Sequence, residues 1–284
     1  MIEGKPSKTA LGPALRRATE SQKSENQRLC YDQYARYFIT KKTTSIGESW
    51  LPRWFVHFVT DYIIEPGVGN FILVRTRVFD DFLIDSLNQG FEQFVVMGAG
   101  YDSRAGRFFA ERKDFPVFEV DFPATQAHKI SLLKTIPNYP LDRIHFVPVD
   151  FTKDSFMDRL LQSGYSPSLR TLFMWEGVTY YIHESDVDKT LRMIHDHSRK
   201  GSRIIFDYYN RVNLQKYIRT WHDKEEPLIW GLHTKDMENF LSARGFSNIV
   251  NNTAASFGKP YYSKTVKKRF VCPFFSIVHA ENAG

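Results

Sequence analysis

Glycines and carboxylates stand in this chain at places where they could bind a charged small molecule. Gly98-Ala99-Gly100 follows a short apolar run, and Asp121 ends a second apolar run about twenty residues further on. This order is typical of the first βαβ unit of a nucleotide-binding α/β domain. Glycines let a ligand approach the backbone closely, because no Cβ blocks it. We therefore expect Asp121 to accept hydrogen bonds from two ribose hydroxyls.

The glycine turn also discriminates between nucleotide ligands. A dinucleotide site has a third glycine where this chain has Ser103, and it needs a helix N-terminus that is free for a pyrophosphate. Asp102 lies on the same turn, and its carboxylate would repel a diphosphate. S-adenosylmethionine (SAM) has no phosphate and carries a sulfonium and an ammonium cation. The turn therefore favours SAM, with an ordinary βα turn of another α/β protein as the alternative.

Two further carboxylates follow expected strands. Asp150 ends the apolar stretch 144–149, and Glu176 ends the stretch 171–175. Ligands of an open parallel sheet bind outside the carboxyl ends of its strands, so these acids should meet the glycine turn. We expect Asp150 and the ring of Phe151 to face adenine. Glu176 is expected to face the ammonium group or the far ribose edge of SAM.

The carboxylate of SAM needs a cation. Arg75 and Arg77 lie on an expected helix before the first strand, and we prefer Arg77, since a guanidinium pairs with a carboxylate through two hydrogen bonds. Arg104 is expected to pair with Asp102 or a neighbour inside the turn. The predicted SAM-binding set is Arg77, Gly98, Ala99, Gly100, Asp121, Phe122, Asp150, Phe151 and Glu176.

The expected elements bring these residues to one edge of a sheet. Apolar stretches predict strands at 93–97, 117–120, 144–149, 171–175 and 202–208, separated by helical patterns at 123–135, 154–162 and 184–197. This alternation is typical of a parallel sheet with helices on both faces. Beyond it we expect a helix capped by Thr234 over 234–244 and closing strands at 246–251 and 269–280.

The flanking segments complete one predicted domain. Residues 13–39 and 70–88 have helical patterns, and 50–64 is rich in aromatic residues. Because no linker separates them from the first strand, we predict an N-terminal helical cap (1–90) on an α/β core (91–284), one structural domain overall. The aromatic and charged segment at about 210–232 is predicted to be a lid insertion.

The composition limits the partners and the compartment. The 284 residues carry a net charge of +6, which is mild for this length and suits an anionic substrate without implying nucleic acid. Cys30 and Cys272 have the spacing of neither a disulfide framework nor a metal site. Residues 1–9 lack the apolar core of a signal peptide, and the run 270–278 is too short to span a bilayer. We therefore expect a cytoplasmic protein without a metal, a membrane or a nucleic acid as partner, and the oligomeric state stays open.

Several motifs, taken in order, resemble those of the leucine carboxyl methyltransferase family, which includes bacterial small-molecule and polyketide O-methyltransferases. The matching segments are 9–11, 17–20, 32–35, 75–81, 98–104, 118–123, 147–151 and 176–181, among which Phe-Glu-Val-Asp-Phe-Pro is quite specific. The resemblance implies an α/β, class I SAM-dependent methyltransferase fold with a Rossmann-like, seven-stranded, mostly parallel sheet. It also implies SAM contacts from Arg77, Gly98, Asp121, Asp150 and Glu176, joined at the SAM carboxylate by Lys41 or Lys42.

We predict a SAM-dependent O-methyltransferase that acts on a small acidic or phenolic substrate of the polyketide type. A carboxylate acceptor is ionised at neutral pH and needs no general base, so alignment can contribute about 7–11 kcal/mol of the rate enhancement. A hydroxyl acceptor needs its proton removed, and Tyr180, Tyr181 and His183 are the catalytic candidates for that step. Aromatic packing beside Glu176 is the alternative role of the tyrosines.

Two other functions remain as alternatives. The first is methylation of a protein C-terminal carboxylate, which is disfavoured because Thr152 stands where protein-modifying members of the family have an arginine. The second is a non-enzymatic or RNA-binding module, based on the adjacent cations Lys267, Lys268 and Arg269. A solvated loop is the simpler interpretation of these three residues.

Overall fold

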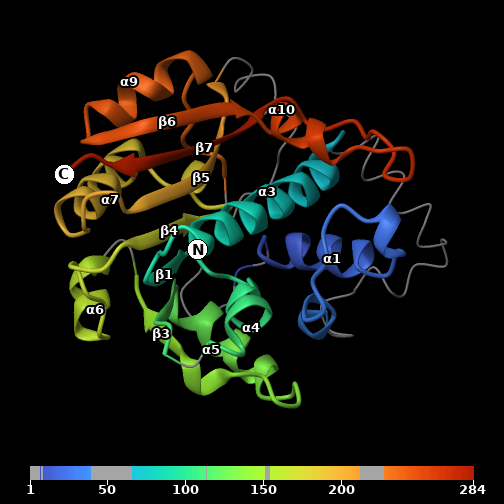
Figure 1. The fold of residues 1–284 in the computed structure, drawn as a ribbon, viewed down its shortest axis with the longest axis horizontal. Coiled ribbons are helices and arrows are strands. Elements are labelled where there is room, and N and C mark those ends of the chain that lie inside the picture. The colour runs from blue at the N-terminus through green and yellow to red at the C-terminus, as the bar shows by residue number, and fades with distance from the viewer. Residues whose placement is uncertain (1–6, 8, 40–65, 113, 151–153, 212–226) are drawn as a thin grey trace.

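One seven-stranded sheet organises the protein (Figure 1). The computed structural model describes residues 7, 9–39, 66–112, 114–150, 154–211 and 227–284. The strands are β1 (Gln93–Met97), β2 (Val117–Asp121), β3 (Ile144–Pro148), β4 (Thr171–Trp175), β5 (Arg203–Tyr209), β6 (Phe246–Thr253) and β7 (Phe275–Asn282). They lie in the order β3-β2-β1-β4-β5-β7-β6, and β7 is antiparallel to both of its neighbours. The predicted class I methyltransferase fold is thus confirmed.

Burial explains the composition of the strands. All five residues of β1, β2 and β4 are buried, which is why these strands are nearly continuous apolar runs. The edge strands β3 and β6 instead mix buried and exposed positions. Glu119 is a buried acid in the middle of β2, and its carboxylate is paired with Lys129 at 2.6 Å.

Helices cover both faces of the sheet. One face carries α1 (Leu11–Glu20), α3 (Val68–Asn88), α4 (Arg104–Phe109), α5 (Pro123–Leu133) and α10 (Ala254–Gly258), whose apolar side chains share a core with the sheet. The other face carries α6 (Phe156–Gln162), α7 (Glu184–Asp196) and α9 (Met237–Ser242). Shorter 3-10 turns are η1 (Glu25–Gln27), η2 (Ala35–Phe38), η5 (Leu141–Arg143), η6 (Thr179–Tyr181), η8 (Thr234–Asp236) and η9 (Lys259–Tyr261).

Three expected elements differ clearly from those observed, while most other bounds shift by only one or two residues. The last strand begins at Phe275 rather than at residue 269, because Pro273 cannot donate to a ladder and the Cys272 N–H is bonded to the Gly67 carbonyl at 3.1 Å. Thr234 does not cap the late helix; it begins η8, and α9 starts at Met237. The second half of 13–39 forms only η1 and η2.

The strand order creates a crevice at a defined place. The chain proceeds from β1 outward to β3 and then returns to place β4 on the other side of β1. Connections leave β1 and β4 in opposite directions, so the space outside their carboxyl ends is the expected ligand site. In the described part of the chain, no helix has the length and apolar character to cross a membrane.

Candidate active site

A cavity of about 500 Å³ opens at the carboxyl ends of β1 to β4. The predicted residues that line it are Gly98, Ala99, Gly100, Asp121, Phe122, Asp150, Glu176, Tyr180 and Tyr181. Arg77 and His183 do not line it. Phe151, Lys41, Lys42 and Thr152 lie outside the described residues. Most of the predicted set therefore shares one cavity, although the chain brings it together from four separate strand ends.

The glycine turn depends on backbone conformations that favour glycine. Gly98 and Gly100 have φ angles of +64° and +42°. A Cβ on Gly98 would collide with the side chain of Val178. Asp121 accepts hydrogen bonds from the N–H groups of Gly100 and of Phe122, the latter at 2.6 Å. The carboxylate that ends β2 thereby holds the turn that follows β1.

Asp102, by contrast, is occupied by an arginine. It accepts the backbone N–H of Arg104 at 2.6 Å and forms an ion pair with the guanidinium of the same residue. Burial raises the pKa of Asp102, but Arg104 and more distant cations outweigh burial and lower the pKa to about 2. Asp102 therefore stays ionised, and most of its charge is already compensated inside the protein.

Glu176 is shared by two buried arginines. Its Oε1 lies 2.9 Å from Arg75 Nε, and its Oε2 lies 2.6 Å from Arg104 Nη1. Burial raises the pKa of Glu176, but the two guanidinium groups lower it further than burial raises it. Glu176 lines the cavity as expected, but both of its oxygens already form ion pairs, and its contact with the ammonium group or the far ribose edge of SAM stays a prediction.

The arginine that faces the cavity is Arg75 and not Arg77. Arg75 is 3% exposed and donates from Nη1 to Asp207 Oδ2 at 2.7 Å and to the Tyr180 hydroxyl at 3.2 Å. Arg77 lies two residues further along α3, about 200° around the helix, so its side chain leaves on the opposite face. It is 43% exposed there and pairs with Asp81.

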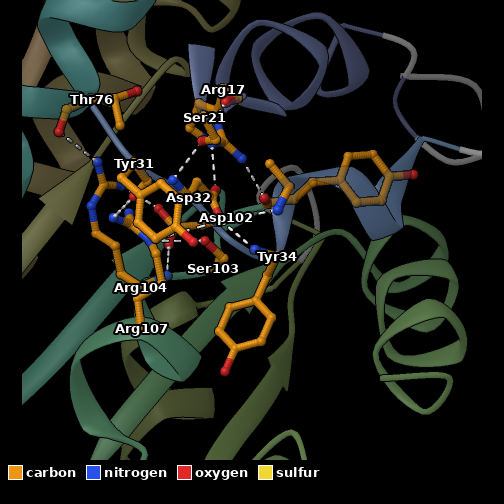
Figure 2. A network of polar contacts seen from close by, with 12 residues as sticks. Arg17, Ser21, Tyr31, Asp32, Tyr34, Thr76, Asp102, Ser103, Arg104 and Arg107 are labelled. Atoms are coloured by element: carbon orange, nitrogen blue, oxygen red, sulfur yellow. Dashed lines mark hydrogen bonds and ion pairs between the residues drawn. The ribbon is translucent and has the colours of Figure 1, made fainter. Parts of the chain in front are cut away.

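The ion pairs at the cavity extend into a larger network (Figure 2). Arg104 and Arg107 both bind Asp80 at 2.7 Å, which ties α4 to α3. Arg17 pairs with Asp32 at 2.8 Å and donates to the Tyr101 carbonyl at 2.6 Å, which ties α1 to the glycine turn. The network thus holds the elements on one side of the cavity through buried charges.

The N-terminal segment supplies a wall that we did not predict. Ser7, Thr9, Ala10, Pro13 and Arg17 line the cavity. The backbone N–H of Ser7 donates to Thr125 Oγ1 on α5 at 3.1 Å. The segments 9–11 and 17–20 were part of the family resemblance, and this was the only signal in the sequence for a role at the site.

Apolar side chains from the segment after β4 and from the described end of the predicted lid segment also line the cavity. Val178, Ile182, Pro227 and Ile229 line it together with Tyr181. The Tyr180 carbonyl accepts the N–H of Ile229 at 2.7 Å, which fixes the described end of the predicted lid segment against η6. Residues 212–226 of that segment lie outside the described part of the chain.

The three candidate bases differ in position. Burial raises the pKa of Tyr180 well above its usual range, which opposes its use as a base. Tyr181 lines the cavity and packs edge-on against Tyr180. His183 is exposed at the N-cap of α7 and does not line the cavity, so its candidacy is corrected.

Comparisons with known proteins agree with this geometry. A family model described as leucine carboxyl methyltransferase matches residues 10–195. A protein of Bacillus subtilis (strain 168), named "Putative S-adenosyl-L-methionine-dependent methyltransferase YktD", is 37% identical over 225 residues, which are 69% of this chain and 72% of its own. A protein of Saccharopolyspora erythraea with the same name apart from "YktD" is 31% identical over 89% of this chain and 88% of its own.

Solved structures share the fold at low identity. The crystal structure of a "putative methyltransferase" from Thermobifida fusca YX covers 99% of this chain with a TM-score of 0.60 and 14% identity, and 97% of that chain is matched. A Streptomyces avermitilis protein of the "duf574 family" covers 80% of this chain with a TM-score of 0.56 and 12% identity, with 88% of that chain matched. At such identities the similarity concerns the fold alone.

Proposed function

The chain belongs to the leucine carboxyl methyltransferase family and is a SAM-dependent methyltransferase, and we propose that it methylates the carboxylate of a small, largely apolar acid. The observation that carries this proposal is a cavity lined by two unlike sets of side chains. One set is polar and includes Asp121, Asp150 and Arg75, and the other is apolar and includes Ile182 and Ile229.

The polar lining residues include the groups that a SAM molecule requires. Asp121, held by two backbone N–H groups, suits the ribose hydroxyls, and Asp150 suits the exocyclic amine of adenine. Arg75 replaces Arg77 as the partner of the SAM carboxylate, since its Nη2 forms no hydrogen bond with the described residues. When bound, SAM supplies an electrophilic methyl group on a positively charged sulfur.

The apolar lining suits the body of a small acid, and the need of a hydroxyl for a base favours a carboxylate acceptor. A carboxylate reacts in its ionised form, so the chain has only to align it and exclude water, which can contribute about 7–11 kcal/mol. A hydroxyl acceptor needs a base, and the raised pKa of Tyr180 opposes that role. Arg17 is a second buried arginine on the cavity wall and suits the acid group of the acceptor.

The acceptor class is tested with SAM that carries a labelled methyl group. We expect label to enter a panel of small carboxylic acids with apolar bodies and to be released as volatile methanol by mild base, since methyl esters are hydrolysed and methyl ethers are not. Base-stable label would mean hydroxyl methylation. Label found mainly in the protein fraction of a cell extract would favour the alternative, methylation of a protein C-terminus.

A further inference from the structure

A buried acid close to the cavity has no role in the proposed function. Asp207 occupies the middle of β5 between Phe206 and Tyr208 and is fully buried. It does not line the cavity. A carboxylate in an otherwise apolar buried strand costs free energy unless all of its charge is paired, and such pairs add little to stability over apolar packing. A role other than stability is therefore worth seeking for Asp207.

The contacts of Asp207 join three elements of the site. Its Oδ2 lies 2.7 Å from Arg75 Nη1 on α3. Its Oδ1 accepts the N–H of Gly177, in the turn after β4, at 2.7 Å. Its backbone carbonyl accepts the hydroxyl of Thr179 at 2.6 Å. The residue thus fixes both the guanidinium that faces the cavity and the turn against which that guanidinium lies.

These contacts determine which nitrogen of Arg75 is left for a ligand. Glu176 binds Nε at 2.9 Å and Asp207 binds Nη1, so two corners of the planar guanidinium are anchored. Nη2 then points in a fixed direction and forms no hydrogen bond with the described residues. Gly177 makes room for this arrangement, because a Cβ there would lie 3.2 Å from Nη1 and 3.4 Å from Nη2.

We propose that Asp207 is a positioning residue that orients Arg75 so that Nη2 meets the carboxylate of the methyl donor. The proposal rests on the proposed function, in which Arg75 binds that carboxylate. Asp207 acts through Arg75 and the Gly177 turn and touches neither donor nor acceptor. Its removal should therefore weaken recognition of the amino-acid half of the donor and leave recognition of the adenosine half unchanged.

The test compares the binding of two ligands, one with and one without the carboxylate of the methyl donor. S-adenosylhomocysteine has the carboxylate and 5′-methylthioadenosine lacks it, and both contain the same adenosine. Asp207→Asn keeps an oxygen for the Gly177 N–H but removes the charge that holds Arg75. By calorimetry we expect at least a tenfold loss of affinity for S-adenosylhomocysteine and a change within twofold for 5′-methylthioadenosine. Arg75→Gln should give the same pattern, and the double variant should lose little more than either single variant.

Glu20 provides a matched control. It is a buried acid that pairs with Arg269 at 2.8 Å and accepts the Leu29 N–H at 2.8 Å, and it does not line the cavity. Glu20→Gln should bind both ligands as the wild type does.

Equal losses for both ligands in folded Asp207→Asn, or no loss for either, would overturn the positioning role. If Asp207→Asn does not fold, Asp207→Glu is measured instead, and an unchanged ratio of the two affinities overturns the proposal. A wild-type protein that binds neither ligand would refute the proposed function itself.

Discussion

The carboxylates at the cavity differ in what they already bind. Asp102 is paired with Arg104, and Glu176 is paired with both Arg104 and Arg75. These arginines neutralise a large part of the negative charge of the two acids. Asp121 is held instead by two backbone N–H groups, which orient its carboxylate without adding a formal charge. A cationic ligand therefore meets a cavity that is less acidic than a count of its carboxylates indicates.

Asp121→Ala should weaken SAM binding at least tenfold. Hydrogen bonds to a charged group are worth about 1.5–3 kcal/mol each, and the ribose would lose this acceptor. Isothermal calorimetry with SAM measures the loss. Asp158→Ala, which changes an exposed acid on α6, serves as the control and should leave the affinity unchanged. Equal affinities of Asp121→Ala and the wild type would contradict the assignment of Asp121.

Substitutions of Arg75 and Arg77 on α3 test which of the two arginines binds the SAM carboxylate. Arg75→Gln should raise the KM for SAM at least tenfold, because it removes the buried cation that we propose binds the SAM carboxylate. Arg77→Gln should change it less than twofold, since an exposed ion pair of this spacing contributes only about 0.3–0.5 kcal/mol. Steady-state kinetics on both variants decide the question, and a larger effect at Arg77 would restore the original prediction.

At the scale of elements, the turn after β1 is shaped by two contacts of different kinds. Asp121 binds it from β2, and Val178 packs on Gly98 from the segment after β4. The ends of three neighbouring strands therefore determine the form of one ligand-binding turn. A change to the turn should affect binding even where it leaves the sheet intact.

Gly98→Ala should abolish SAM binding, because the new Cβ collides with Val178 at a φ of +64°. Gly90→Ala is the matched control, since Gly90 has a φ of +78° and a Cβ added there would meet no atom within 4 Å. Both variants carry the cost of a left-handed residue, about 1–2 kcal/mol, which thermal unfolding measures. Only Gly98→Ala should lose binding. Comparable binding by the two variants would show that the contact with Val178 is unimportant.

At the scale of the whole molecule, buried charges make stability depend on pH in two directions. Burial raises the pKa of Asp102, but its arginine partner lowers it from 3.8 to about 2, so its stabilisation is present above pH 3.8 and lost as the pH falls toward 2. Burial also raises the pKa of Glu119, here from 4.5 to about 7 despite Lys129, so its stabilisation is present below pH 4.5 and lost as the pH rises through 7. The two effects oppose each other.

We therefore expect the free energy of unfolding to be greatest near pH 4.5, where the contribution of Asp102 is complete and that of Glu119 has only begun to fall. Urea unfolding at a series of pH values from 3 to 9 measures it, at constant ionic strength because salt screens charges. A steady rise from pH 5 to pH 9 would contradict the contribution of Glu119. Stability that does not change between pH 5 and pH 3 would contradict the contribution of the paired acids.

The sequence by itself determined the strands, their alternation with helices and the ends at which ligands bind. The bounds of β1 and β4 were predicted to the residue, because buried parallel strands are short apolar runs between polar turns. Asp121 and Asp150 could be placed at the cavity for the same reason, since a residue at or just beyond the end of a strand must lie at its carboxyl edge. Such inferences need only local periodicity.

Only the tertiary structure decided which charges meet. Arg104 and Glu176 are 72 residues apart, and Arg75 and Asp207 are 132 apart, so no local pattern indicates these pairs. The rotation of α3 against the sheet placed Arg75 inside and Arg77 outside, because residues two positions apart on a helix lie on nearly opposite faces. A carboxylate is free or neutralised according to its partners in space, and packing alone selects those partners.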